Sequence, residues 1–390
     1  MGDRNRKLIA VSAIGLFGLL AAACGSDDSS DAGAGDTAPP ADSATPTEAP
    51  GTTDAPATEP PTTDAPQPEW TSVDAPDDCM CADGSAYKYW VREADPEKVV
   101  FYMEGGGACF SAETCDYTAG NFDVTVDADD DPALRDGLFA FDNELNPLAD
   151  YSFVFVPYCT GDVHIGNATT EYSPELTIHH RGSVNASTAL ADLAARFPGA
   201  KEIVVAGESA GSIPSPLYAG LAADLFPEAA ITVLADGSGA YPDIPALNET
   251  IGGVWGTQNA IPDWPVNEGL TAAEWSLPGL FVQAGRHVPD RIVFARHDFA
   301  FDNTQVFFAE LAGIPADDLV SLMDQNEAQI EAAGVDLLSF ISPGDEHTIL
   351  WSADLYTHEV EGVRLIDWVT DLFGGEPVTD VHCEVCTLDP

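Results

Sequence analysis

One short segment, AGESAGS at residues 206–212, contains the side chain best suited to covalent chemistry. Its central residues, with Ser209 in the middle, match the pattern G-x-S-x-G. In that pattern the serine stands on a strained turn between a strand and a helix, where its hydroxyl acts as a nucleophile. The chain has 34 glycines among 390 residues, so an ordinary turn is the alternative, and the neighbouring segments decide between the two.

Short apolar runs on both sides of this segment predict buried strands. They lie at residues 99–103, 153–156, 203–206, 231–234, 292–295 and 337–341. Unbroken Val, Ile and Phe, without alternation, indicates strands covered on both faces, as in a parallel sheet. Helical stretches at 189–197 and 210–225 flank the strand 203–206. The order predicts an α/β fold, with a mostly parallel sheet flanked by helices. Ser209 then follows a strand and opens a helix, so we interpret it as the nucleophile.

The histidine of a serine hydrolase on such a fold follows the serine and the acid along the chain. The candidates are His287, His297, His347, His358 and His382. His347 lies in the loop directly after the strand 337–341, and α/β sheets hold their chemistry in loops at the carboxyl ends of strands. His358 and His382 lie further along and are predicted on a solvated surface. We expect His347 to take the proton of Ser209.

The acid is expected after the preceding strand, 292–295, where Asp298 and Asp302 both stand. Asp298 is nearer the strand, and Asp302 lies at an expected helix start. Asp236, after the strand 231–234, is a third candidate. Spacing does not choose among the three, and either of the first two could instead be a helix N-cap.

Backbone donors for a developing oxyanion are expected from the glycine-rich run at 104–108, which follows the strand 99–103. Glycine lets the backbone approach the substrate closely. The N–H of Ala210, directly after Ser209, is the expected second source.

Five blocks of the sequence resemble the pectin acetylesterase family, which includes Notum-like carboxylesterases. They are CADGSAYKY at 81–89, YMEGGGACFSAETC at 102–115, YCTGDVHIG at 158–166, GESAG at 207–211 and VLADGSG at 233–239. A weaker match, FDNTQVFF at 301–308, resembles the acid motif of the family. The blocks span most of the chain from residue 79 to about residue 350, so the resemblance covers the domain as a whole.

The resemblance implies an α/β-hydrolase-like fold and a Ser-Asp-His triad. It implies Ser209 as the nucleophile and His347 as the base. It favours Asp302 over Asp298 as the acid, and it leaves Asp236 as a structural residue.

The same resemblance implies the oxyanion donors and one disulfide. The donors fall on Gly106, Gly107 and Ala210. Cys109 and Cys115, which follow the glycine run with the spacing of the family, are implied to form a local disulfide. No cofactor and no metal is expected.

Two departures from the family pattern bear on the acyl group. Ala108 stands where many relatives carry an aromatic residue, and Ser212 replaces a glycine after the serine turn. Residues 240–290 are an expected cap insertion over the site, and their aromatic side chains are expected either to line a pocket or to belong to the core. Those side chains are Tyr241, Trp255, Trp264, Trp275 and Phe281.

The N-terminal segment predicts export. Three basic residues precede an apolar run at 8–23, which suits a signal peptide. The ending Ala-Ala-Ala-Cys resembles a lipobox, so Cys24 is the expected lipidation site at the cell surface. Residues 24–78, rich in Asp, Thr and Pro, predict a disordered tether. Residues 79–390 are the expected catalytic domain.

The expected domain carries 51 Asp and Glu against 11 Lys and Arg, a net charge of about −40. Phosphates would repel such a surface, so nucleic acid is excluded as a partner, and a polyanionic substrate is disfavoured. Beyond Cys24 the chain has seven cysteines, which in an exported protein predict disulfides with one thiol left over. Zinc at Cys383-x-x-Cys386 is the rival interpretation, but the chain has no second such pair.

These observations predict an exported serine carboxylesterase that cleaves O-acyl esters, with acetyl as the default that the family implies. The expected substrate is an acylated small molecule, a glycan or a lipid-like ester, and a membrane is involved only through the lipid anchor. One alternative is a tethered binding protein that has lost the chemistry. Another is an amidase or peptidase with the same triad, because fold and triad do not separate these reactions.

Overall fold

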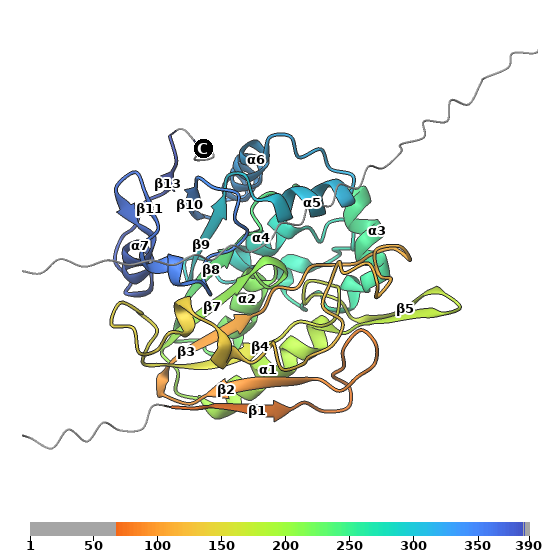
Figure 1. Ribbon diagram of the computed structural model, residues 1–390, viewed down its shortest axis with the longest axis horizontal. Coiled ribbons are helices and arrows are strands. Elements are labelled where there is room, and N and C mark those ends of the chain that lie inside the picture. The colour runs from red at the N-terminus through yellow and green to blue at the C-terminus, as the bar shows by residue number, and fades with distance from the viewer. Residues whose placement is uncertain (1–67, 385, 387–390) are drawn as a thin grey trace, which may run out of the picture. The chain divides into compact units, whose positions relative to one another are not determined.

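The computed structural model describes residues 68–384 and residue 386, and its central feature is a nine-stranded sheet (Figure 1). The strand order is β1-β2-β4-β3-β7-β8-β9-β10-β13. The strands are β1 (Trp70–Asp74), β2 (Lys88–Arg92), β3 (Asp95–Met103), β4 (Tyr151–Val156), β7 (Glu202–Glu208), β8 (Ala230–Asp236), β9 (Ile292–Phe299), β10 (Leu338–Ser342) and β13 (Val381–His382). From β4 to β13 every pair is parallel, whereas β1 and β2 add an antiparallel edge.

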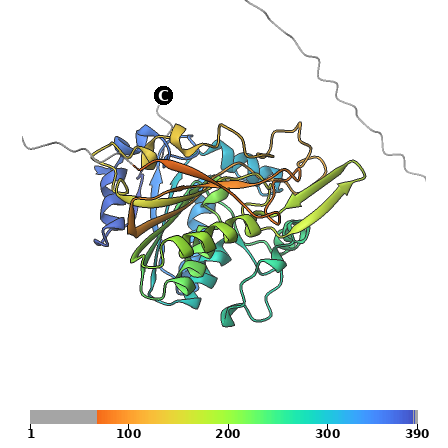
Figure 2. The ribbon, with the colours of Figure 1, turned by 90° about the horizontal axis from the view of Figure 1, so that it is seen from below.

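Helices cover both faces of this sheet (Figure 2). The helices are α1 (Gly182–Arg196), α2 (Ser215–Leu225), α3 (Pro245–Trp255), α4 (Leu277–His287), α5 (Asn303–Leu311), α6 (Leu319–Ala332) and α7 (Leu365–Phe373). One apolar core joins the sheet to α1, α2 and α4, and a second joins it to α5 and α7. Phe101 and Val205 belong to the first core, whereas their neighbours Tyr102 and Val204 belong to the second. This alternation means that both faces of the sheet are buried.

Shorter elements complete the fold. They are the hairpins β5 (Ala168–Ser173)–β6 (Leu176–His180) and β11 (Glu359–Val360)–β12 (Val363–Arg364), and the 3-10 turns η1 (Pro132–Leu134), η2 (Gly137–Phe139), η3 (Ser209–Gly211), η4 (Thr257–Asn259), η5 (Pro265–Asn267) and η6 (Ala353–Tyr356). The β5–β6 hairpin projects from the body of the fold (Figure 1).

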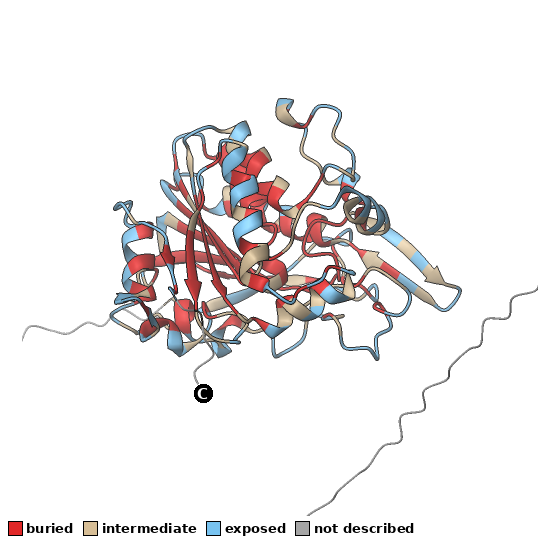
Figure 3. Cartoon of the chain, turned by 90° about the horizontal axis from the view of Figure 1, so that it is seen from above, coloured by how far each residue is buried: buried red, intermediate tan, exposed pale blue. Residues whose placement is uncertain are grey.

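The α/β-hydrolase-like fold predicted from the sequence is confirmed. All six predicted strands lie in the central sheet, and the sheet interior is buried (Figure 3). The strand predicted at 292–295 is four residues longer and ends at Phe299, because polar residues continue it. That extension places Asp298 inside β9 instead of in the loop that follows it.

The central sheet extends beyond the domain boundary predicted at residue 79. The sheet already begins at Trp70, nine residues earlier, where β1 pairs with β2. Trp70 packs on Phe139 and Phe153, with ring centroids 6.2 and 5.9 Å apart. Thr71, Ser72 and Asp74 are exposed, as suits an edge strand, and this polar composition resembles that of the predicted tether.

The predicted signal peptide, the lipidation site Cys24 and most of the tether lie outside the described residues. Among the helices that the structure describes, none combines the length and the apolar character that a membrane span requires.

Three disulfides join six cysteines of the described chain, and the buried Cys79 is the remaining thiol. The pair Cys109–Cys115 is the one that the family resemblance implied. Cys383 and Cys386 form a disulfide, so the rival zinc interpretation does not hold there. The third disulfide, Cys81–Cys159, closes a separation of 78 residues. A loop of that length stabilises a fold by about 4 kcal/mol in the chain-entropy model. Such disulfides are typical of extracellular proteins.

Candidate active site

Ser209 stands on a strained turn between β7 and α2. Its φ is +53°, a left-handed conformation that costs an ordinary residue about 1–2 kcal/mol. The turn also needs glycine, because a Cβ on Gly211 would lie 2.1 Å from the carbonyl oxygen of Met103 at the end of β3. Strain of this kind persists where the surroundings impose it, commonly at functional sites. The local geometry is that of a nucleophile elbow.

His347 lies in the loop after β10, and its imidazole is oriented by Asp302. Nδ1 of His347 is 2.7 Å from Oδ2 of Asp302. A carboxylate only accepts hydrogen bonds, so Nδ1–H donates and Nε2 is left as the basic nitrogen. Nε2 is buried and has no hydrogen-bond partner within the described chain. His347 and Ser209 line the same cleft.

Asp302 is fully buried and is also the N-cap of α5. Its Oδ1 accepts the backbone N–H groups of Thr304 and Gln305 at 2.8 and 2.9 Å. The two roles that the sequence analysis treated as alternatives, helix N-cap and partner of the histidine, therefore belong to one carboxylate. The cap fixes the carboxylate so that Oδ2 points at His347.

The other two candidate acids, Asp298 and Asp236, form hydrogen bonds with groups other than His347. Asp298 accepts hydrogen bonds from the N–H of Gly239 and the side chain of Gln305, at 2.7 and 2.9 Å. Asp236 is 2.7 Å from Nδ1 of His297. Neither carboxylate is hydrogen-bonded to His347 in the structure, whereas Asp302 is.

The glycine-rich loop lies beside the elbow, where Gly105 packs against Ser209. The N–H groups of Gly106, Gly107 and Ala210 have no hydrogen-bond acceptor in the part of the chain that the structure describes. Gly107 has φ +76°, and a Cβ there would lie 2.0 Å from the carbonyl oxygen of Asn121. Only glycine fits this position, so the loop keeps free N–H groups close to Ser209.

Beneath this loop lies a buried ionic cluster that the sequence analysis missed. Arg135 forms an ion pair with Glu104, and both side chains are 7% exposed. Oε1 of Glu208 accepts the N–H of Gly105 at 3.0 Å. Burial raises the pKa of Glu208 to about 7, although the Arg135 guanidinium, the Tyr102 hydroxyl and the Gly105 N–H oppose the shift. Glu208 therefore connects the elbow to the glycine-rich loop.

The raised pKa of Glu208 predicts a pH-dependent contribution to stability. The folded protein holds this proton more tightly, so the contribution is present below the ordinary pKa of about 4.5 and is lost as the pH rises through about 7. Between pH 5 and 8, the free energy of unfolding should fall more for the wild type than for Glu208→Gln. The difference should be on the order of 3 kcal/mol at most. Urea unfolding at several pH values measures it, and parallel pH profiles would contradict the assignment.

An apolar cavity lies on one side of Ser209. Its volume is about 120 Å³, and it receives side chains from the glycine-rich loop, from α3 and from α5. Members include Ala108, Ile213, Leu247, Ile251, Phe308 and Ile314. Of the five aromatic residues in the expected cap, Tyr241, Trp255 and Trp275 line this cavity, whereas Trp264 and Phe281 are core residues. Three of the five aromatic residues therefore line a pocket, as one of the two expectations for the insertion proposed.

Ala108 and Ser212, the two departures from the family pattern, differ in whether they line the apolar cavity. Ala108 lines the apolar cavity. Ser212 is fully buried away from the cavity, and its hydroxyl donates to the carbonyl of Ser209 at 2.7 Å. Ser212 therefore supports the elbow and does not touch the expected acyl group.

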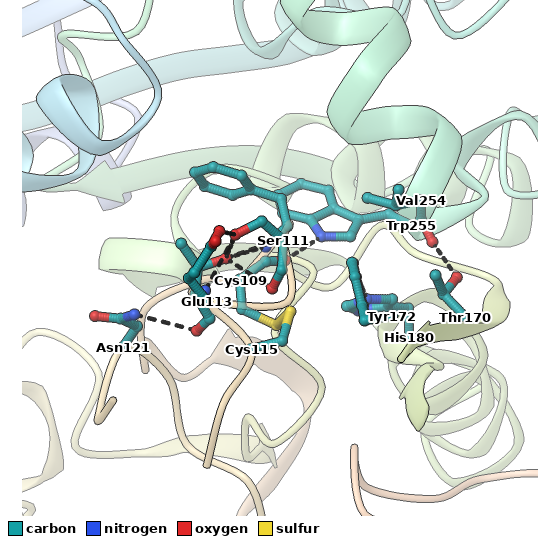
Figure 4. The surroundings of a disulfide bond; sticks show 12 residues. Cys109, Ser111, Glu113, Cys115, Asn121, Thr170, Tyr172, His180, Val254 and Trp255 are labelled. Carbon is teal, nitrogen blue, oxygen red and sulfur yellow. Dashed lines mark hydrogen bonds between the residues drawn. A yellow bond between two sulfur atoms is a disulfide. The ribbon is translucent and has the colours of Figure 1, made fainter. Parts of the chain in front are cut away.

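The disulfide Cys109–Cys115 fastens the loop that follows Gly106 and Gly107 (Figure 4). The indole N–H of Trp255 donates to the carbonyl of Cys109 at 2.6 Å (Figure 4). This bond joins the end of α3, and with it one wall of the cavity, to the disulfide loop.

On the other side of Ser209 lies a polar cleft. It is lined by Glu208, His347, Trp351 and a group of four acidic side chains. These are Asp123, Asp127, Asp129 and Asp130. Desolvation and the carboxylates of Asp130 and Asp127 raise the pKa of Asp123 to about 6. Arg135 also lines the cleft, but Glu104 pairs with its charge. The lining of the cleft is therefore predominantly negative.

The fold and the site define an α/β-hydrolase with a serine elbow between an apolar cavity and a polar cleft. The model of the Pectinacetylesterase family matches residues 65–253. Among curated proteins, palmitoleoyl-protein carboxylesterase notum2 of Xenopus laevis is 32% identical over 136 residues, which are 34% of this chain and 27% of the relative. The NOTUM protein of Homo sapiens is 30% identical over 136 residues, with the same coverage. Over these segments the chain is similar to pectin acetylesterases and Notum-like proteins, whose names are those of carboxylic ester hydrolases.

The matched segments contain only part of the proposed site. The matched segment spans about a quarter of the length of the first curated relatives, 27% in both cases. The family match contains Ser209 and the glycine-rich loop but ends before Asp302 and His347. A third relative, from Danio rerio, carries the name inactive palmitoleoyl-protein carboxylesterase notum1b and is 32% identical over 91 residues, 22% of this chain and 66% of its own.

Proposed function

We propose that this chain is an exported serine carboxylesterase that cleaves O-acyl esters through an acyl-enzyme on Ser209. The observation that carries the proposal is the place of Ser209, on a strained elbow beside free backbone N–H groups and in the same cleft as the Asp302–His347 pair. Asp302, His347 and Ser209 then act as acid, base and nucleophile. Gly106, Gly107 and Ala210 form the oxyanion hole.

The first half of the reaction forms the acyl-enzyme. The Ser209 hydroxyl gives its proton to Nε2 of His347 while its oxygen bonds to the ester carbonyl carbon. The carbonyl electron pair moves onto its oxygen, which accepts hydrogen bonds from Gly106, Gly107 and Ala210. When the carbonyl re-forms, the bond to the alcohol breaks, and the alcohol oxygen takes the proton from Nε2. Asp302 holds the imidazole in the required tautomer.

The second half releases the acid. A water molecule gives a proton to Nε2 of His347 as its oxygen attacks the acyl carbon. The tetrahedral intermediate then breaks its bond to Ser209, whose oxygen recovers the proton from Nε2. The carboxylic acid leaves, and the site returns to its starting state.

The two cavities support an assignment of the two halves of the ester. The apolar cavity takes the acyl group, and its volume of about 120 Å³ exceeds what an acetyl group fills. For scale, an apolar cavity of about 150 Å³ holds benzene. The alcohol part lies in the acidic cleft, which opposes an anionic polymer such as a pectic chain. The favoured substrates are therefore short- to medium-chain esters of an uncharged alcohol, in a glycan, a small molecule or a lipid-like ester.

Hydrolysis of p-nitrophenyl acetate, butyrate and octanoate by the full chain tests the proposed function. We expect turnover of all three, with kcat/KM highest for butyrate or octanoate. The p-nitroanilide of butyric acid is the matched amide, and it should be cleaved far more slowly. Faster cleavage of the amide would instead identify an amidase. A folded protein that cleaves none of these compounds would contradict the esterase proposal.

Ala108 should set the length of the acyl chain that the cavity accepts. Ala108→Phe fills the part of the cavity beside the oxyanion loop. It should lower kcat/KM for the octanoate at least about 10-fold, while the acetate changes less than about 3-fold. Ala112→Phe is the matched control, because Ala112 is exposed on the same loop and does not line the cavity. Equal losses for both esters would contradict the assignment of this cavity to the acyl group.

The competing proposal is a tethered binding protein without catalytic activity. The relative from Danio rerio whose name includes the word inactive supports it. A folded chain that retains the elbow but binds an acylated ligand without turnover would favour it.

Export and lipidation at Cys24 are part of the esterase proposal, and the three disulfides support export. The mass of the mature N-terminal peptide would establish whether Cys24 carries a lipid.

A further inference from the structure

Four polar side chains form a chain of hydrogen bonds at the carboxyl ends of β8, β9 and β10. Asp236 and His297 are register partners in neighbouring strands, and Oδ1 of Asp236 is 2.7 Å from Nδ1 of His297. Nε2 of His297 is 2.9 Å from the hydroxyl of Ser342, the last residue of β10. The same hydroxyl is 2.8 Å from Nε2 of His358. Asp236, His297 and Ser342 are fully buried, whereas His358 is half-buried and is not the solvated residue predicted from the sequence.

The hydrogen bonds of this chain have one direction when both histidines are neutral. Asp236 as a carboxylate only accepts, so Nδ1–H of His297 donates to it. Nε2 of His297 then accepts from the Ser342 hydroxyl, and the Ser342 oxygen accepts from Nε2–H of His358. Burial and the neighbouring His297 lower the pKa of His358, which favours its neutral form.

This arrangement resembles a second Ser-His-Asp triad but has no access to substrate. The Ser342 side chain is fully buried. None of its three members lines the apolar cavity or the polar cleft beside Ser209. The network therefore has a role other than nucleophilic attack.

The far oxygen of Asp236 reaches the segment that carries His347. Oδ2 accepts the backbone N–H of Ile349 at 2.7 Å and that of Leu350 at 3.0 Å. These residues follow His347 by only two and three positions. One end of the network thus holds the backbone next to the proposed base, and the other end is His358, sixteen residues beyond Ser342.

We propose that Asp236, His297, Ser342 and His358 are positioning residues that fix the backbone after His347 and thereby hold its imidazole toward Ser209. The effect on turnover rests on the proposed function of Ser209 and His347. The network orients Asp236 because His297 accepts from Ser342 and donates to one carboxylate oxygen. The other oxygen is then directed at Ile349 and Leu350. A displacement of about 1 Å at a reacting group can cost about 10²-fold in rate, which gives such a network a measurable effect.

The chemistry of the network predicts that Asp236→Asn is tolerated. The asparagine oxygen can accept from Ile349 and Leu350, while its NH₂ donates to Nδ1 of His297. The hydrogen bonds along His297, Ser342 and His358 then all reverse direction, so the two backbone N–H groups, the His297 ring and the Ser342 hydroxyl keep their partners. Asp236→Ala has no such solution, because it leaves both backbone N–H groups and the imidazole without a partner.

Kinetics of the full-length Asp236→Ala and Asp236→Asn variants on p-nitrophenyl butyrate test the proposal. Asp236→Ala should lower kcat about 10- to 100-fold with KM within about 2-fold, because the acyl cavity is untouched. Asp236→Asn should restore kcat to within about 5-fold of the wild type. If Asp236→Ala does not fold, Ser342→Ala, which breaks the chain at its middle, should lower kcat about 10-fold with KM unchanged. An Asp236→Ala or Ser342→Ala variant with wild-type kcat, or an Asp236→Asn variant as slow as Asp236→Ala, would overturn the proposal.

Hydrogen exchange separates this proposal from the proposed function. Amide exchange of the peptide that contains Ile349 and Leu350, followed by mass spectrometry, does not depend on turnover. The amides should exchange faster in Asp236→Ala and at the wild-type rate in Asp236→Asn. If the wild type shows no esterase activity but the exchange rates follow this pattern, the proposed function fails and the positioning network stands. Unchanged exchange in a folded Asp236→Ala variant would overturn the network even in an active esterase.

Discussion

Ser209→Ala should lower kcat for p-nitrophenyl butyrate by about 10⁶-fold, the largest effect that we expect from a single substitution. The variant removes the only atom that can form the acyl-enzyme and leaves the cavity, the cleft and the Asp302–His347 pair in place. The backbone at this position has φ +53°, which alanine adopts at about the same cost as serine, so the fold should persist. Residual hydrolysis would come from water acting beside the oxyanion donors.

Ser212→Ala is the matched control for Ser209→Ala. It removes a hydroxyl three residues away, which donates to the carbonyl of Ser209 and lies 2.5 Å from the hydroxyl of Ser238. Its kcat should fall by about 10-fold or less, because the variant loses buried hydrogen bonds to Ser209 and Ser238 but no reacting atom. A fluorophosphonate probe should label Ser212→Ala but not Ser209→Ala. Equal activity of Ser209→Ala and the wild type would show that another residue is the nucleophile.

The parts of the proposed site that depend on local sequence signals could be predicted. Ser209 lies between a buried strand and a helix, and both elements are visible as runs of apolar residues. The glycine-rich loop likewise follows an apolar strand directly. In each case the functional group and the element that positions it are neighbours in the chain, so their spatial relation follows from covalent geometry.

The proposed acid could not be chosen from spacing because the choice depends on where a strand ends. β9 continues through polar residues to Phe299, and Asp298 therefore points to one face of the sheet from within the strand. Asp302 lies beyond the end, where the chain turns into α5. Both are aspartates close to the end of an apolar run, and only the extra residues of β9 separate their roles. The resemblance to the family, and not the spacing, favoured Asp302.

The buried polar groups were missed because their partners are remote in sequence. Glu208 reaches the N–H of Gly105 across 103 positions, and Asp236 reaches His297 across 61. Such contacts depend on strand order and register, which apolar runs do not encode. A partial signal existed for the second pair, since Asp236 follows one predicted strand and His297 follows the next one along the chain.

Asp302→Asn should lower kcat by about 10⁴-fold while the protein remains folded. Asparagine can still cap α5 through its oxygen, so the loss of stability that alanine would cause at an N-cap, about 1 kcal/mol, is avoided. Its NH₂ group, however, faces Nδ1 of His347, which must then become an acceptor. The proton moves to Nε2, and that nitrogen can no longer take the proton of Ser209.

Asp298→Asn separates this effect from the loss of any buried carboxylate near the site. Burial raises the pKa of Asp298, so the site penalises the charge that the amide removes. The amide oxygen can still accept from Gly239 and Gln305, and kcat should stay within about 10-fold of the wild type. The pH profile adds a second criterion, because Asp302→Asn should recover activity only where hydroxide replaces the base. A mild Asp302→Asn beside a severe Asp298→Asn would mean that the carboxylate hydrogen-bonded to His347 in the structure is not the one that supports catalysis.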